Sequence, residues 1–228
     1  MVPRPLWERT FPPDERNRIS LVTRAMLVRV GTRKILVDTG IGDRWDGKNR
    51  AIYGIDHSSG GLDGALQRVG LSRADLTDVV LSHLHFDVAG ALTREEGAQP
   101  KLAFPNATIH LQRRHWKWAH QPSEKDRGSF REQDFSVLER SGQLHLLEGA
   151  TELYAGVNLV VSEGHTVGMQ LVRLEHDSHT LMFCGDLIPT TGHLHAPWVS
   201  AFDLYPLTSI EEKRQLLAQA VEENWRLF

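Results

Sequence analysis

Residues 81–90 read LSHLHFDVAG, and this stretch decides the fold. His83, His85 and Asp87 stand at alternate positions, and residues two apart in an extended or tightly turned segment face the same way. The two imidazoles can therefore converge on one cation with the carboxylate beside them. Neutral imidazole with carboxylate suits zinc, and also iron or manganese. Val88, which fills the next place, has a side chain that cannot bind a metal.

The segments around this motif indicate an α/β sheet. TDVVLS is short, apolar and β-branched, so we predict a buried strand that delivers HLHFD at its C-terminal end. Open α/β sheets place their functional sites at that end. Upstream, ISLVTRAMLVRVG and ILVDTG flank the turn GTRK and predict an antiparallel strand pair, and a helix is predicted at about 61–69.

Downstream segments predict a second sheet. KLAFP and ATIHLQ are strand-like, whereas the polar and aromatic stretch at about 112–142 is predicted to be a partly helical inserted flap. Short apolar runs then follow, and the last of them, MQLVRLEHDSHTLMFCGD, predicts a hairpin that turns at HDSH. His165 and Asp186 stand at glycine-marked ends of these predicted strands.

The chain ends with a predicted helix in LTSIEEKRQLLAQAVEENW. Ser209 and Glu212 could form a capping box, and Ile210, Leu217, Ala220 and Val221 are predicted to line one face. The residues after it look like the start of another strand. We found no repeat or linker that would divide residues 1–228, so a single domain is expected.

Composition excludes several classes. A formal charge of -3 gives no electrostatic reason to bind nucleic acid. No apolar stretch approaches the roughly 20 residues of a membrane span, and the start of the chain lacks the core of a signal peptide, so we expect a cytoplasmic protein. A lone cysteine, Cys184, excludes a thiolate cluster and is expected to be a small buried hydrophobe.

Four motifs resemble those of a known family. VDTG at 37–40, SHLHFD at 82–87, GHTVG at 164–168 and CGD at 184–186 are similar, in order and spacing, to motifs of the metallo-β-lactamase superfamily of metal-dependent hydrolases. The tail is most similar to the small bacterial lactonases and organophosphate hydrolases. The resemblance implies an αββα sandwich of two mixed sheets flanked by helices, here apparently lacking the last strand.

The resemblance also implies roles for individual residues. By this comparison, the first metal is bound by His83, His85 and His165, with Asp186 reaching it and bridging toward a second metal. Asp87 would bind the second metal or, without one, hold and deprotonate the attacking water. Asp38 would orient a ligand histidine, although a simple turn carboxylate is an equally good interpretation.

Two departures from the family pattern affect the second metal. Val88 stands where the family usually has a histidine, and the chain ends before the strand that carries another. Asp87 and Asp186 alone are too few ligands to hold zinc firmly, so we expect one tight metal and a second that is weak or absent. HLH at 193–195 could replace the lost ligands, although a contact with the substrate or with a carboxylate behind a metal ligand is the favoured role for a loop imidazole there. Alternatively, the natural chain continues past Phe228 into the missing strand.

Other aromatic and imidazole side chains divide into two groups. The loop between Asp186 and the last helix is expected to shape a pocket for a small-molecule substrate, through His193, Trp198, Phe202 and Tyr205, with Trp45 and Tyr53 as weaker candidates. Four further histidines are expected to be surface or hydrogen-bonded core residues: His110, His145, His176 and His179. His115 and His120 could line a substrate pocket with Trp116 and Trp118, but an amphipathic helix that packs its tryptophans is the favoured interpretation.

The function predicted from these residues is hydrolysis of a small ester, lactone or phosphoester by a metal-activated water. The alternative is a non-catalytic, vestigial member of the fold that binds metal without turnover, because both departures fall on the same half of the centre. The missing strand would expose a sheet edge, which a homodimer would cover.

Overall fold

The structure, a computed structural model, describes residues 2–96 and 99–228. The chain forms two compact units, Thr23–Glu148 and Met1–Val22 together with Gly149–Phe228. Each unit contains one five-stranded mixed sheet with helices beside it. The predicted α/β class is therefore confirmed, whereas the single domain stays a prediction.

The Thr23–Glu148 unit is built on a sheet of order β1-β2-β3-β6-β7. β1 and β2 are antiparallel, as predicted, and the other neighbours are parallel. β4 and β5 form a separate antiparallel pair. The strands are β1 (Met26–Val30), β2 (Arg33–Val37), β3 (Asp78–Val80), β4 (Thr93–Glu96), β5 (Gln99–Leu102), β6 (Thr108–Gln112) and β7 (Leu144–Leu147).

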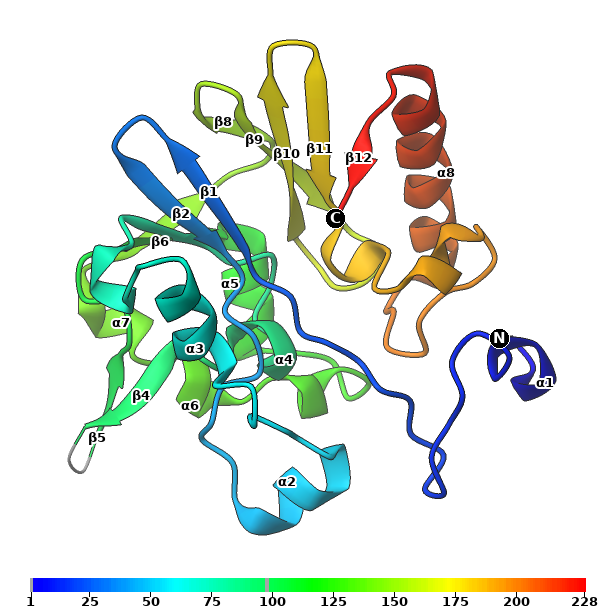
Figure 1. The fold of residues 1–228 in the computed structure, drawn as a ribbon, viewed down its shortest axis with the longest axis horizontal. Helices are drawn as coiled ribbons and strands as arrows, with labels where there is room; N and C mark the ends of the chain where they lie inside the picture. The colour runs from blue at the N-terminus through cyan, green and yellow to red at the C-terminus, as the bar shows by residue number, and fades with distance from the viewer. Residues whose placement is uncertain (1, 97–98) are drawn as a thin grey trace. The chain divides into compact units, whose positions relative to one another are not determined.

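Short helices connect the strands of this unit, and α2 lies away from the sheet (Figure 1). They are α2 (Gly47–Tyr53), α3 (Gly61–Arg68), α4 (Phe86–Ala89), α5 (Arg113–His120), α6 (Glu132–Phe135) and α7 (Leu138–Ser141), with 3-10 turns at Arg73–Asp75 and Arg127–Ser129. α3 confirms the helix predicted at 61–69. The 112–142 segment is partly helical, as predicted, and Ala119, Phe135 and Leu138 anchor it in the core of this unit. That it is an insertion stays a prediction.

The other unit has a sheet of order β12-β11-β10-β9-β8. Its neighbours are antiparallel except β12, which runs parallel to β11. The strands are β8 (Thr151–Tyr154), β9 (Val157–Ser162), β10 (Met169–His176), β11 (His179–Phe183) and β12 (Arg226–Leu227), and the helices are α1 (Arg4–Trp7) and α8 (Pro206–Glu222), with 3-10 turns at Gly185–Leu187 and Thr191–Leu194. The hairpin predicted at HDSH is confirmed, because His176 pairs with His179.

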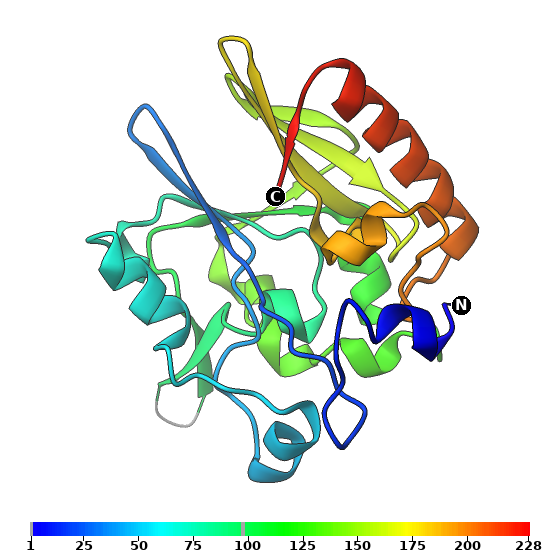
Figure 2. The ribbon, with the colours of Figure 1, turned by 45° about the vertical axis from the view of Figure 1, so that its right-hand side comes forward.

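Helix α8 lies along this sheet in both ribbon views (Figure 2). It differs from the prediction because it begins at Pro206 and not at a capping box. Its buried stripe is Ser209, Lys213, Leu216 and Ala220, whereas Val221 is 83% exposed. The prediction from apolar residues placed the buried face wrongly, because two of its four residues are a serine and a lysine.

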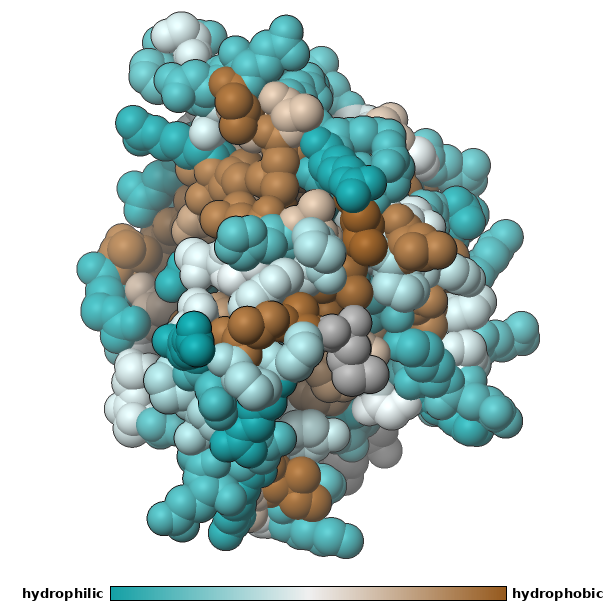
Figure 3. Space-filling view, turned by 90° about the vertical axis from the view of Figure 1, so that its right-hand side faces the viewer, coloured by the Kyte–Doolittle hydropathy of each residue, from teal (hydrophilic) through white to brown (hydrophobic). Residues whose placement is uncertain are grey.

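The surface around α8 carries both hydrophobic and hydrophilic side chains (Figure 3). Seen from the side on which Figure 1 draws α8, hydrophobic surface is interrupted by hydrophilic side chains (Figure 3). Leu207 and Val221 are exposed at the two ends of the helix. Within the described ranges, no helix has the length and apolar composition that a membrane span requires.

The chain end pairs with the sheet, as the sequence predicted. Beyond β12, the backbone N–H of Phe228 donates to the carbonyl of Met182 over 2.8 Å, and the N–H of Cys184 donates to the carbonyl of Phe228 over 3.1 Å. Cys184 is buried in the core beside Met182, and burial raises the pKa of its thiol to about 12. The prediction that Cys184 is a buried hydrophobe is confirmed.

Candidate metal centre

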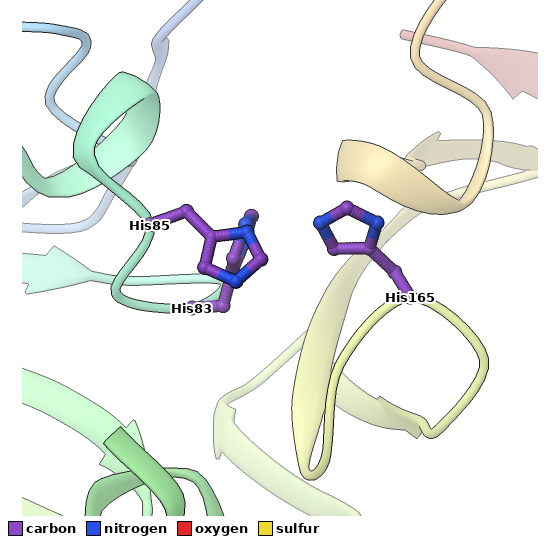
Figure 4. A group of neighbouring side chains, drawn as sticks. All are labelled: His83, His85 and His165. Atoms are coloured by element: carbon purple, nitrogen blue, oxygen red, sulfur yellow. The ribbon is translucent and has the colours of Figure 1, made fainter. Parts of the chain in front are cut away.

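His83 and His85 lie together where the chain leaves β3. His85 is the N-cap of α4, and both side chains are buried. Their ring centroids are 4.4 Å apart in an edge-on arrangement, and Figure 4 shows both rings extending from one short stretch of chain. Asp87, half-buried, follows in the first turn of α4. The structure thus brings together the imidazole pair that the HxHxD spacing predicted.

A close backbone contact fixes α4 in place. A Cβ atom on Gly90 would lie 2.1 Å from the carbonyl oxygen of Ile41, so only glycine allows this approach. The carbonyl of Val88 also accepts hydrogen bonds from the N–H and hydroxyl of Thr39 and from the N–H of Gly40, at 2.8, 2.9 and 3.1 Å. The side chain of Val88 is buried in the core. Val88 therefore serves packing and anchors the turn after β2.

Asp38 is linked to His83 through Ser82. The backbone N–H of Ser82 donates to Oδ1 of Asp38 over 2.7 Å, and its hydroxyl donates to Oδ2 over 2.8 Å. The single hydroxyl proton is thus committed to Asp38, so the Ser82 oxygen accepts from Nδ1–H of His83, 2.9 Å away. In neutral His83, this places the lone pair on Nε2.

The 112–142 segment supports the same loop. His115, fully buried on α5, accepts at Nε2 from the N–H of Leu84 over 2.8 Å. The ring of Phe130 lies 4.7 Å from the ring of His85, centroid to centroid. His115 therefore holds the backbone between the two motif histidines, a role that the helix-packing interpretation missed.

His165 and Asp186 belong to the other unit. His165 lies in the loop between β9 and β10 (Figure 4). Its Nδ1 is 3.0 Å from Oδ1 of Asp203, and its Nε2 is 3.4 Å from Oδ2 of Asp186. Since a carboxylate can only accept, Nδ1 carries the proton toward Asp203. Burial raises the pKa of Asp186, and His165 opposes that rise.

Helix α8 clamps the His165 loop. Glu212 accepts from the hydroxyl of Ser162 over 2.7 Å and from the N–H of Glu163 over 2.8 Å. A Cβ atom on Gly164 would lie 2.4 Å from Oγ of Ser209, so glycine is required where loop and helix meet. The backbone N–H of Leu204 donates to the carbonyl of His165 over 3.0 Å. These contacts fix the position of His165 within its unit.

Comparison of the sequence with models of known protein families gives a match that covers nearly the whole chain. A family model described as the metallo-beta-lactamase superfamily matches residues 20–227. The chain belongs to this superfamily. The expected fold class and family are thereby confirmed.

Known members of the superfamily with similar sequences are lactonases. The chain is 29% identical over 202 residues to the N-acyl homoserine lactonase AttM of Agrobacterium fabrum, a match that covers 85% of this chain and 72% of that protein. It is 29% identical over 161 residues to AttM of Azorhizobium caulinodans, covering 67% of this chain and 57% of that protein. The chain thus spans between half and three quarters of the length of these relatives.

Two solved structures extend the likeness. A probable metal-dependent hydrolase from Staphylococcus aureus is 28% identical with a TM-score of 0.92, covering 100% of this chain and 80% of that one. AidC, described as a dizinc quorum-quenching lactonase in complex with a product, is 25% identical with a TM-score of 0.73, covering 90% of this chain and 70% of that one. The likeness to these two structures therefore extends over most or all of this chain.

The buried side chain of Lys213 holds the loop at residues 193–198, which is expected to shape a substrate pocket. Nζ of Lys213 donates to the carbonyl oxygens of His193, His195 and Trp198. Nδ1 of His193 is 2.8 Å from Oγ1 of Thr190. Burial, and next the charge of Lys213, lower the pKa of His193, which favours its neutral form. A neutral imidazole has one nitrogen that donates and one that accepts, and contact of His193 with a substrate stays a prediction.

The other expected pocket residues lie in varied surroundings. Gly192 packs so closely that a Cβ atom there would lie 2.7 Å from Phe11 and 3.1 Å from Trp198, which places the N-terminal segment against this loop. Phe202 and Tyr205 are 68% and 46% exposed. In the Thr23–Glu148 unit, Trp45 and Tyr53 contact each other at 5.3 Å between ring centroids and both contact Phe86. Their roles in substrate binding stay predictions.

Sequence reasoning missed several residues around the candidate ligands. Ser82 stands inside the quoted motif and offered a visible signal, as a hydroxyl directly before a ligand histidine. Asp203 is 38 positions from His165, in a loop where a lone aspartate indicates a turn. Glu212 was expected to form a capping box with Ser209, and Lys213 looked like an ordinary polar position on a surface helix.

Proposed function

We propose that His83, His85 and His165 bind one zinc ion and that the protein hydrolyses a small ester-type substrate with a zinc-activated water. The observation that carries the proposal is that a carboxylate stands behind two of the three histidines. Asp38 acts on His83 through Ser82, and Asp203 contacts His165 directly. Metal-binding histidines typically donate their other ring N–H to such a partner.

The chemistry of the donors fits zinc. With Nδ1–H of both His83 and His165 directed at acceptors, Nε2 is the ring nitrogen that would bind a cation, and Nε2 of His165 already lies 3.4 Å from Oδ2 of Asp186. Three imidazoles are a known catalytic set for zinc, and iron or manganese accept the same donor types. The free thiol of Cys184, buried in the core, takes no part.

The residues around such an ion have separate tasks. A bound zinc ion supplies a Lewis acid and lowers the pKa of water to about 7. Asp87, in the first turn of α4, accepts the proton of the attacking water. Asp186, beside His165, completes the ligand set, and His193 contacts the substrate.

The proposed centre holds one tight metal. The side chain of Val88 is apolar and packed into the core, so it adds no ligand for a second ion. Of the ligands that the family pattern implies for that ion, the described residues offer Asp87 and Asp186. The second ion is therefore expected to be weak or absent, in contrast to the two zinc ions in the description of AidC.

The proposed substrate class is a lactone. The curated relatives are named N-acyl homoserine lactonases, and AidC is described with the product N-hexanoyl-L-homoserine. An N-acyl homoserine lactone is a small neutral ring ester with an acyl chain, and the product named for AidC is the hydroxy acid that forms when such a ring is opened. Other small esters, such as aryl esters, and phosphoesters are the alternative substrates.

A substrate panel with defined metals tests this function. Protein stripped of metal and reloaded with zinc, manganese or iron is assayed on N-hexanoyl homoserine lactone, simple lactones, aryl esters and a phosphotriester. We expect turnover that follows metal loading and disappears, together with metal retention, in His83→Ala and His165→Ala. His176→Ala, on an exposed hairpin, is the matched control and should leave both unchanged. Full turnover in His165→Ala would contradict the proposal.

A second candidate is a vestigial member that binds metal without turnover. The observation that favours it is the packing of Val88 into the core at a ligand position of the family. Stoichiometric zinc with no turnover on any class of the panel would support this alternative. The cytoplasmic location and the homodimer stay predictions, to be checked by fractionation and by size-exclusion chromatography with light scattering.

A further inference from the structure

A second pair of histidines lies in the sheet of the Thr23–Glu148 unit. His110 on β6 and His145 on β7 are direct neighbours in the parallel register of these strands. Their Nδ1 atoms are 3.1 Å apart. His110 is buried and His145 is exposed. Neither residue belongs to the proposed zinc centre.

A carboxylate fixes the inner histidine. Nε2 of His110 is 2.8 Å from Oδ1 of Asp78 on β3, and Asp78 is fully buried. Because the carboxylate accepts, His110 is protonated on Nε2 and its lone pair is on Nδ1, the atom that faces His145. Oδ2 of Asp78 accepts from Thr77 over 2.6 Å, with Arg33 3.7 Å away. Arg33, Asp78 and His110, on neighbouring strands, thus form a chain of contacts that directs the lone pair of His110 toward His145.

The spacing of the two nitrogens matches a chelate. Imidazole nitrogens bound to zinc at about 2.0–2.1 Å, with an angle between 90° and the tetrahedral value, lie about 2.9–3.4 Å apart. The observed 3.1 Å falls inside that range. Neutral His145 could move its proton from Nδ1 to Nε2, because its ring is exposed to water. A metal would then replace the hydrogen bond between the rings without net proton release.

We propose that His110 and His145 form a separate site for a divalent transition metal, Cu²⁺ or Zn²⁺, with Asp78 behind His110 and water completing the coordination. Cu²⁺ is favoured by the general order of affinities for nitrogen ligands. The strands hold both rings in place, so little ordering is required on binding. A consequence follows for the proposed zinc centre: two metals per chain would not by themselves indicate a dinuclear active site.

Copper titration of the stripped protein tests the site. Wild type, His145→Ala and His176→Ala are titrated with Cu²⁺ in the presence of glycine, which competes with weak binding to single histidines, and the bound ion is followed by electron paramagnetic resonance. His145 and His176 are both exposed, so neither substitution should disturb the core. We expect His145→Ala to bind one equivalent fewer than the other two proteins and to lose a signal with two nitrogen ligands.

Asp78→Asn provides the second measurement. Loss of a carboxylate behind a ligand histidine typically weakens metal affinity about 10–100-fold, so the same equivalent should bind Cu²⁺ more weakly by that factor. Equal copper stoichiometry and affinity in wild type and His145→Ala would overturn the proposal. The result is independent of the hydrolase function, because His83, His85 and His165 are unchanged in each protein.

Discussion

Oδ1 of Asp203 lies 3.0 Å from Nδ1 of His165, and both side chains are buried. This contact sets which ring nitrogen of His165 carries the proton. It also joins the loop after β9 to the segment that leads into α8. Asp203 is thus a positioning residue for the proposed centre.

Replacing Asp203 should weaken metal binding. Asp203→Asn keeps an acceptor oxygen but loses the charge, and Asp203→Ala loses both, so affinity should fall in that order by about 10–100-fold. Competition with a chromophoric chelator measures the change. Asp177→Asn, at the exposed hairpin turn, is the control and should bind as wild type does. Equal metal affinity in all four proteins would show that Asp203 does not position His165 for metal binding.

Ser82→Ala should interrupt the link from Asp38 to His83. The alanine removes the hydroxyl that accepts from Nδ1–H of His83, so both tautomers of the ring become accessible and zinc affinity should fall about tenfold or more. Asp38→Asn should act through the same link, so the double variant should lose little beyond Ser82→Ala. A double-mutant cycle of zinc affinities tests this. Additive losses would mean that the two residues act separately.

Lys213→Met should loosen the loop at residues 193–198. Methionine fills a similar space but cannot donate to the carbonyls of His193, His195 and Trp198, and each buried carbonyl left unsatisfied costs about 1–3 kcal/mol. Urea unfolding should show the loss of stability, and hydrogen exchange should rise in this loop. Arg214→Met, at the exposed neighbouring position, is the matched control.

The sequence predicted the elements that have strong local signals. Alternation and turn residues located the β1–β2 and β10–β11 hairpins, and the HxHxD spacing located His83 and His85 at the end of β3. These features depend on neighbours in the chain. Residues that are close in sequence therefore suffice to predict these hairpins and the position of the two histidines.

Features that depend on distant packing were not predictable in this way. Lys213 lies on the buried face of α8 because loop carbonyls accept its hydrogen bonds. A pattern of hydrophobic residues cannot predict the burial of a lysine. The contacts of Asp203 with His165 and of His115 with Leu84 join residues more than 30 positions apart. Such pairs follow from the fold and have no motif of their own.

Asp134 should make stability depend on pH. Its carboxyl is buried on α6, 3.9 Å from Arg44 and 3.6 Å from Arg131, and burial raises its pKa from 3.8 to about 7, against the effect of the two arginines. The folded state therefore holds this proton more tightly than the unfolded state, so the contribution to stability is full below pH 4 and is lost as pH rises toward 7.

Asp134→Asn isolates that contribution. The free energy of unfolding of the variant minus that of wild type should increase between pH 4 and pH 8 by an amount on the order of a few kcal/mol. Chemical denaturation at several pH values measures it. A difference that stays constant across this range would contradict the assignment to Asp134.

Val88→His should restore a ligand for a second metal. The side chain at this position follows Asp87 in α4, and the bonds that anchor the turn after β2 are made by the backbone carbonyl of residue 88, which histidine also has. We expect retained zinc to rise from one equivalent toward two. Val88→Leu keeps the apolar packing and should retain one. Elemental analysis after dialysis gives the count, and it should be made with His145→Ala in each protein, so that His110 and His145 do not contribute. Two equivalents in the Val88→Leu protein would show that the centre is dinuclear without any ligand at position 88.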